Sequence, residues 1–373
     1  MHGLGPQDRR NLVILAVVAI AMVFLYGEIR YTIRPYSGWD LANYRAMAQA
    51  APGLTRDIVP PFPYRILGPY VAGLLPLPDP IAFRLLSAAA SVSLVVLFYG
   101  FLRTAGLTPA VTLISVVLYT FSRYWFGFTS WNYFQLADLL SQIYIVVLFW
   151  SMLSSRWWIF GATLVLAALT RETGLLMAPV ALIYLWSRGE LASRWRTLLL
   201  AIVPALLVFL LLRLTVPVGP GQGLSGALAA NASKLLSPER LGRLLVTPLL
   251  PYTFIPLVFF EITIRFFRAR VWALAFVVLV VASTLFGSND ERLMAPVFIV
   301  AYWLIGLVLE ATGPRPWFVA VLLVAGFAST LHHMIARFPL QDPGLTRLLS
   351  LGALGVVTAA AVALRLQQRR QPG

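Results

Sequence analysis

Acidic, basic and aromatic residues stand together in several short polar segments of this chain. The clearest of these mixed segments are Gly38–Trp39–Asp40, Pro63–Tyr64–Arg65, Arg123–Tyr124–Trp125, Thr170–Arg171–Glu172–Thr173 and Asp290–Glu291–Arg292. A carboxylate can remove the proton of a hydroxyl group, and a guanidinium group can bind two oxygens of one phosphate. The mixed segments therefore predict a reaction site that handles protons and negative charge.

A second set of polar segments is marked by plain arginine. Its members are Arg9–Arg10, Arg103, Arg156, Arg188, Arg194, Arg196, Arg265, Arg268, Arg270, Arg315, Arg365, Arg369 and Arg370. In a multi-pass membrane protein, successive loops alternate between the two sides, and loops rich in arginine lie in the cytoplasm. The plain-arginine loops are therefore predicted to be cytoplasmic, and the mixed segments extracytoplasmic.

The composition is that of an integral membrane protein. Apolar residues make up 60% of the chain and charged residues 12%, against about 45–50% and 25% in soluble domains. The net charge of +15 would suggest a nucleic-acid partner for a soluble protein. Here the surplus lies in short loops, where it orients the chain and meets acidic membrane lipids, so no nucleic-acid partner is predicted. The absence of cysteine excludes disulfides, thiolate catalysis and cysteine-based metal sites.

The apolar runs predict an all-α, polytopic bundle of about twelve transmembrane helices, some of them short, in a single domain of residues 1–373. They fall at about 11–27, 81–102, 108–122, 137–154, 157–169, 173–187, 197–216, 248–263, 271–287, 293–311, 317–334 and 345–366. The first is read as an uncleaved signal anchor. With this number of crossings both termini lie in the cytoplasm, and the protein belongs to a cell inner (plasma) membrane.

Residues 157–187 are predicted to form a hairpin. A single helix of this length would measure about 46 Å, against a hydrocarbon core of about 30 Å, and would put Arg156 and Arg188 on opposite sides. Two short arms keep both arginines in the cytoplasm, and the turn at residues 170–173 then lies below the outer surface. Charged backbone at such a depth is tolerated when it is buried in protein or lines a watery cavity.

Two extracytoplasmic loops are long, at residues 28–80 and 217–247. Both exceed ordinary connections, which favours a functional role or lateral helices. In the first loop, apolar residues of the stretch 39–51 recur at helical spacing, which predicts a helix lying on the membrane surface. The second loop contains an amphipathic stretch that reaches residue 247.

The first long loop also carries a family resemblance. A single Asp40 next to Trp39, soon after the first transmembrane helix and ahead of an interfacial helix, resembles the first outer loop of GT-C glycosyltransferases. The segments 60–69 (PPFPYRILGP) and 169–176 (LTRETGLL) are similar to segments of uncharacterised bacterial members of that class. The resemblance implies a membrane enzyme that moves a sugar from a polyprenyl-phosphate donor at the extracytoplasmic face.

The chain also departs from the best-known members of that class. Its first loop has no Asp-x-Asp or Glu-x-Asp pair, and it has no soluble periplasmic domain. The sequence therefore indicates no metal site, although the cofactor question stays open, and the expected acceptor is a lipid or a glycan. The predicted catalytic residue is Asp40, and the predicted substrate-binding residues are Trp39, Tyr64, Arg65, Arg171, Glu172, Asp290 and Arg292.

These candidates have structural alternatives. Asp40 could act as the general base or could cap a helix in a box with Ser37. Arg65 could bind a lipid phosphate or extend to ordinary headgroups. Arg171 and Glu172 could contact the donor or could only pair with each other.

Two further acidic positions near helix starts have the same ambiguity. Residues 290–292 could bind substrate, or could only begin a helix capped by Ser288 and Glu291. Asp138 is predicted to cap the helix at 137–154.

The favoured function is an inverting glycosyl transfer of a hexose or pentose, in which Asp40 removes the acceptor proton. A transporter or lipid flippase that uses an outward-facing charged cavity is the alternative. It predicts charges along a translocation path and repeated halves with broken helices, and no repeat is evident. A non-catalytic scaffold would leave the mixed segments without a role.

Overall fold

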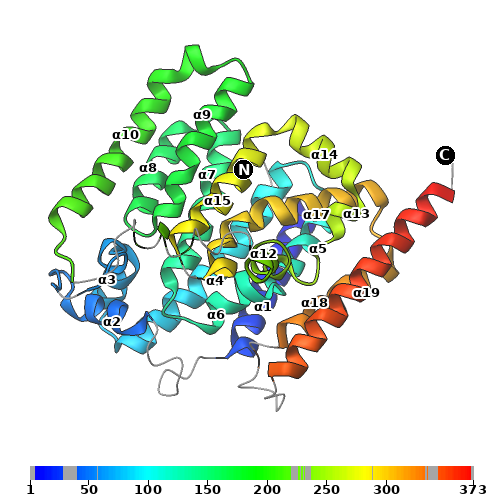
Figure 1. The fold of residues 1–373 in the computed structure, drawn as a ribbon, viewed down its shortest axis with the longest axis horizontal. Helices are drawn as coiled ribbons and strands as arrows, with labels where there is room; N and C mark the ends of the chain where they lie inside the picture. Colours follow the sequence, from blue (N-terminus) through cyan, green and yellow to red (C-terminus); the bar gives the residue numbers. More distant parts are fainter. Residues whose placement is uncertain are drawn as a thin grey trace.

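The protein is described by a computed structural model for residues 5–27, 40–56, 58–219, 226, 228–229, 231, 237–287, 289–331, 334 and 343–370. All regular secondary structure in these ranges is helical. Figure 1 shows the helices packed side by side, with α10 along one edge of the bundle and α18 and α19 along the other. The predicted all-α polytopic fold is confirmed.

Within the described ranges, six helices are long and apolar enough to cross a membrane. They are Pro6–Tyr26 (α1), Asp79–Thr104 (α4), Leu136–Leu153 (α7), Leu191–Thr215 (α10), Ala295–Thr312 (η7 with α17, Phe298–Thr312) and Gly344–Arg370 in α19 (Pro343–Arg370). Two bent pairs bring the number to eight, namely α5 (Pro109–Thr120) with Arg123–Trp131 and α14 (Phe260–Ala269) with Val271–Phe286. Shorter apolar helices cover Trp157–Ala168 (α8), Glu172–Ser187 (η4 and α9) and Pro316–Thr330 (α18). The chain is therefore a multi-pass membrane protein.

The other short helical elements connect these segments or form part of the bent pairs. They are α2 (Leu41–Ala50), η2 (Phe62–Tyr64), α3 (Leu67–Leu74), η3 (Arg123–Gly127), α6 (Phe128–Trp131), α12 (Pro238–Leu245), η5 (Thr247–Leu249), α13 (Ile255–Val258), α15 (Val271–Ser283), η6 (Thr284–Phe286) and α16 (Asp290–Leu293). The helix predicted within residues 39–51 corresponds to α2. The amphipathic stretch before residue 247 corresponds to α12.

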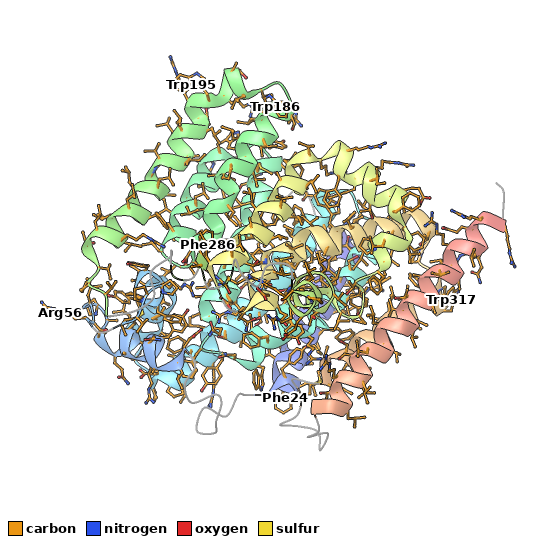
Figure 2. All side chains as sticks on the ribbon, viewed as in Figure 1. Phe24, Arg56, Trp186, Trp195, Phe286 and Trp317 are labelled. Atoms are coloured by element: carbon orange, nitrogen blue, oxygen red, sulfur yellow. The ribbon has the colours of Figure 1, made fainter. Side chains whose placement is uncertain are left out.

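The bundle has two chemically different ends. At one end Arg103 donates to Asp8 at 2.8 Å and the backbone of Thr108 donates to Glu310 at 3.0 Å, which joins the start of α1, the end of α4 and the end of α17. We call this the arginine end, because Arg9, Arg10 and Arg103 belong to it. In Figure 2, Phe24 near the end of α1 lies far from Trp186 and Trp195, at the turn from α9 to α10. The end of α1 and the turn from α9 to α10 thus lie far apart in the bundle.

The predicted hairpin at 157–187 is present. Arg171, in the turn between α8 and η4, contacts Asp138 in the first turn of α7, whereas Tyr184 near the end of α9 packs on Trp272 at 5.8 Å between ring centroids. The turn is tight, since a Cβ on Gly174 would lie 2.4 Å from the Cβ of Ala167. The hairpin places Arg171 at the end of the bundle opposite the arginine end.

The prediction of one continuous helix at 248–263 is wrong. The chain there forms only η5 and α13 before α14 begins at Phe260, and α14 bends by 101° into the next helix. Pro248, Pro251 and Pro256 interrupt the segment because proline lacks a backbone donor and breaks helices. Leu250, Tyr252 and Ile255 are buried, so protein covers this irregular backbone, the condition for such backbone inside a membrane.

Candidate active site

Asp138 is the centre of a buried charged cluster. It lies in the first turn of α7, and its side chain is 1% exposed. Its Oδ1 accepts a hydrogen bond from Nη1 of Arg171, and its Oδ2 accepts one from Nε of Arg292. The prediction that Asp138 caps a helix is therefore wrong, because both carboxylate oxygens are held by arginines from two distant segments.

Asp40 joins this cluster through Arg292. Its Oδ2 accepts a hydrogen bond from Nη1 of Arg292 at 3.0 Å and another from Nε2 of Gln135 at 2.5 Å. Asp40 stands at the start of α2, but its side chain makes no capping hydrogen bond. The two hydrogen bonds fix the orientation of the Asp40 carboxylate, and 22% of the side chain is exposed.

Arg65, Glu172 and Arg213 form a looser group beside the cluster. Nε of Arg65 lies 3.6 Å from Oε2 of Glu172, and Nη2 of Arg213 lies 3.8 Å from Oε1. Arg65 is buried and also donates to the hydroxyl of Tyr44 at 3.4 Å. Tyr64 packs its ring against Arg213, whose guanidinium carbon lies 4.5 Å from the ring centroid.

Arg171 and Glu172 thus have different partners, although they are neighbours in sequence. Arg171 bonds to Asp138, and Glu172 lies between Arg65 and Arg213. The alternative that the two residues only pair with each other is wrong. The reason is local: the backbone of Arg171 is extended, with φ −165° and ψ 133°, and successive side chains of an extended chain point to opposite sides.

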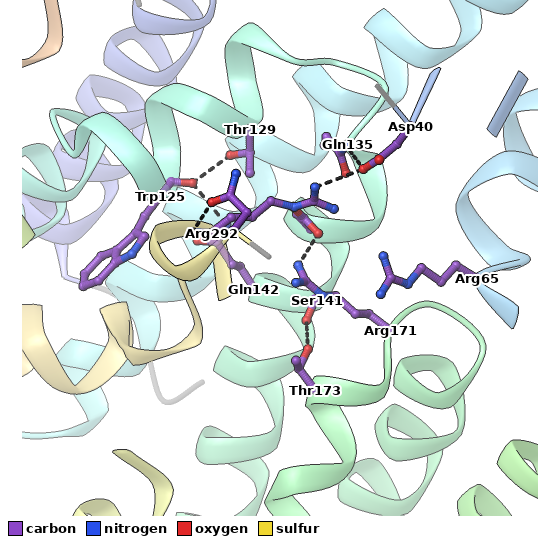
Figure 3. A network of polar contacts seen from close by, with 12 residues as sticks. Asp40, Arg65, Trp125, Thr129, Gln135, Ser141, Gln142, Arg171, Thr173 and Arg292 are labelled. Carbon is purple, nitrogen blue, oxygen red and sulfur yellow. Dashed lines mark hydrogen bonds and ion pairs between the residues drawn. The ribbon is translucent and has the colours of Figure 1, made fainter. Parts of the chain in front are cut away.

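The cluster places the guanidinium groups of Arg65, Arg171 and Arg292 against carboxylates of Asp40, Asp138 and Glu172. Burial alone would lower the pKa of Arg65, but the Glu172 carboxylate and the Tyr44 hydroxyl raise it above its ordinary value. Burial also opposes the charge of Arg292, and Asp138 and Asp40 raise the pKa of that group. Figure 3 shows Arg65, Arg171 and Arg292 converging from three segments of the chain. Buried guanidinium groups in this arrangement can bind an anion with several oxygens, such as a phosphate.

Asp290 does not join the cluster. Its Oδ1 lies 3.1 Å from Nη2 of Arg240, and its Oδ2 accepts from Nε of Arg243 at 3.3 Å. Arg240 is 2% exposed and also donates to the backbone oxygens of Asn231 and Thr284, at 2.7 and 2.9 Å. Asp290 therefore attaches α16, which carries Arg292, to α12.

We expect Asp290→Asn to destabilise the protein while leaving its chemistry largely intact. The change leaves the buried Arg240 without a carboxylate partner, which is costly. The thermal midpoint should fall, and the turnover of the folded fraction should stay within about tenfold of wild type. A loss of turnover as large as that of Asp40→Asn would instead support the substrate-binding role that the sequence predicts for Asp290.

Sequence reasoning missed Gln135, Arg213 and Arg240, and gave Asp138 the wrong role. A signal for Asp138 was present, because a carboxylate within an apolar run is expensive unless it is paired or functional. Trp39, Ser37, Ser288, His332 and His333 lie outside the described residues. Within the described ranges, no three His, Asp or Glu side chains are grouped so as to hold a metal ion.

Comparison with known proteins gives one informative result. No protein-family profile and no curated protein matches the sequence. The fold is similar to the crystal structure of ArnT from Cupriavidus metallidurans bound to undecaprenyl phosphate, with a TM-score of 0.51 and 15% sequence identity over 95% of this chain and 76% of that chain. The chain therefore has the polytopic helical fold that the resemblance to GT-C glycosyltransferases implies.

Proposed function

We propose that the protein transfers a sugar, a hexose or a pentose, from a polyprenyl-phosphate donor to a lipid or glycan acceptor. Asp40 is the general base, and Arg65, Arg171 and Arg292 bind the donor phosphate. The observation that carries the proposal is the convergence of one partly exposed carboxylate and three largely buried arginines at a single place. The fold likeness to a protein bound to undecaprenyl phosphate supports the choice of donor.

The proposed reaction is a single displacement with inversion at the anomeric carbon. Asp40 accepts the proton of the acceptor hydroxyl as its oxygen attacks the anomeric carbon. The bond from that carbon to the phosphate oxygen breaks, and the phosphate keeps the electron pair. The arginines stabilise the negative charge that develops on the phosphate in a largely dry site.

A retaining mechanism with a covalent intermediate fits the site less well. It requires a second carboxylate near the anomeric carbon to act as nucleophile. Asp138 is the nearest candidate, but it is 1% exposed and both its oxygens are held by arginines. We therefore propose inversion.

The test is sugar transfer by the purified, full-length protein in proteoliposomes. Polyprenyl-phosphate hexose and pentose donors, labelled in the sugar, are supplied with lipid and glycan acceptors, and the anomeric configuration of the product is determined. Wild-type protein should form an inverted product, and Asp40→Asn should form almost none. Movement of the intact donor across the bilayer without transfer would support the transporter or flippase alternative.

The proposed site faces the extracytoplasmic side, and both termini face the cytoplasm. The proposal rests on the plain-arginine loops, because Arg103 marks the end of the bundle opposite to the cluster. Single cysteines at positions 55, 230 and 340 of this cysteine-free chain should react with an impermeant maleimide added outside intact cells. Labelling from the cytoplasmic side alone would invert the topology and move the site to the other face.

A further inference from the structure

Two carboxylates share Arg292, and they hold it with unequal strength. Asp138 accepts from Nε of Arg292, and its side chain is 1% exposed. Asp40 accepts from Nη1 at 3.0 Å, and its side chain is 22% exposed. Water-accessible ion pairs contribute little and exchange readily, whereas breaking a buried pair is costly. The contact between Arg292 and Asp40 is therefore the one that another anion can replace.

The Asp40 contact also conflicts with the proposed role of Asp40. A general base must accept a proton, and the Asp40 oxygen that bonds to Arg292 also accepts from Gln135. A carboxylate oxygen offers two lone pairs, and the two donors occupy both lone pairs of this oxygen. In this arrangement that oxygen can accept a substrate proton only if one of its two donors, such as the Nη1 group of Arg292, changes partner.

On the basis of the proposed function, we propose that the donor phosphate takes over the Nη1 group of Arg292 from Asp40. Asp138 keeps its bond to Nε, so the guanidinium group stays in place while its second partner changes. Asp40 is then released as the base only after the donor has bound. It follows that the donor binds before the acceptor reacts.

The surroundings of Arg292 are suited to this exchange. Arg65 is buried, and its Nε makes no hydrogen bond among the described residues, because the Oε2 atom of Glu172 that faces it lies 3.6 Å away. A phosphate oxygen could supply the hydrogen bond that this Nε lacks. Gln135 would still donate to Asp40 after the Nη1 group of Arg292 has turned to the phosphate, which keeps the carboxylate oriented. In Figure 3, Gln135 and Arg292 both approach Asp40. Arg65 lies close to Arg171 in the same view.

The exchange can be measured with polyprenyl phosphate, the leaving group, which binds without reacting. In purified full-length protein in detergent, Asp40→Asn should raise the affinity for polyprenyl phosphate by about two- to fivefold, the range expected when a partly exposed ion pair no longer competes. The matched control is Asp79→Asn. Asp79 is 20% exposed in its side chain and pairs with Arg45 at 3.4 Å, away from Arg292, so its substitution should leave the affinity unchanged.

A double-mutant cycle separates exchange from simple charge removal. Removing a negative charge near a phosphate raises affinity even if Arg292 does not change partners. In an Arg292→Lys background, the ammonium group keeps the charge beside Asp138 but cannot hold both carboxylates as the guanidinium fork does. There the gain from Asp40→Asn should fall below about twofold, because the coupling between the two residues is lost. Arg292→Gln provides the same comparison, and thermal midpoints identify which variants are folded.

The outcomes distinguish this inference from the function on which it rests. An equal gain from Asp40→Asn with and without Arg292 would show that only charge matters, and the exchange would be wrong while the glycosyl transfer stands. Unchanged affinity in Asp40→Asn would show that Asp40 does not compete with the phosphate, and the exchange would again be wrong. Failure of the wild-type protein to bind polyprenyl phosphate at all would contradict the proposed function itself.

Discussion

Asp40→Asn is expected to lower sugar transfer by about 10²–10⁴-fold, the usual contribution of a positioned general base. The protein should remain folded and inserted, because the asparagine carbonyl can still accept hydrogen bonds from Gln135 and Arg292, the two donors to Asp40 in the wild-type protein. Initial rates with a saturating donor, measured beside the thermal midpoint, test this expectation. The loss should appear mainly in kcat, since the base acts in the chemical step.

The control for Asp40→Asn is the same substitution at Asp79, another partly exposed carboxylate with an arginine partner. Asp79→Asn should transfer sugar at a rate close to wild type. Turnover near wild type in Asp40→Asn would contradict the proposed base and leave Asp40 as a structural partner of Arg292.

Asp138→Ala is expected to cause the largest loss of stability at the site. The change leaves Arg171, which is 4% exposed, and Arg292 without the carboxylate that compensates both. Removing one partner of a buried ion pair typically costs about 3–5 kcal/mol. A marked fall in the thermal midpoint in detergent, together with loss of transfer, should follow.

Glu172→Ala is the matched comparison for Asp138→Ala. The Glu172 side chain is 35% exposed and lies at 3.6 and 3.8 Å from its two arginines, so its loss should destabilise the protein less than the loss of the buried Asp138. Combining Arg171→Ala with Asp138→Ala should be less damaging than the sum of the two single changes, because they remove the same pair. Equal destabilisation by Asp138→Ala and Glu172→Ala would show that Asp138 is not the centre of the cluster.

Apolar length and arginine placement were sufficient to predict the membrane class, the helical fold and the hairpin at 157–187. These properties follow from local physical rules, since a helix must match the membrane thickness and charged loops must remain outside it. The same rules failed at 248–263, where an apolar run suggests a helix although Pro248, Pro251 and Pro256 interrupt it. Hydropathy measures how apolar a segment is, and it does not report whether the backbone can form consecutive hydrogen bonds.

The sequence by itself singled out five residues that the structure places in or beside one cluster: Asp40, Arg65, Arg171, Glu172 and Arg292. Only the tertiary structure decided their partners. Arg171 bonds to Asp138 rather than to the adjacent Glu172, and Arg292 reaches Asp40 across 252 residues of sequence. Adjacent side chains of an extended turn point apart, whereas helix packing brings distant loops to the same end of the bundle. Ion pairing depends on separation in space and on burial, and neither quantity is contained in the order of residues along the chain.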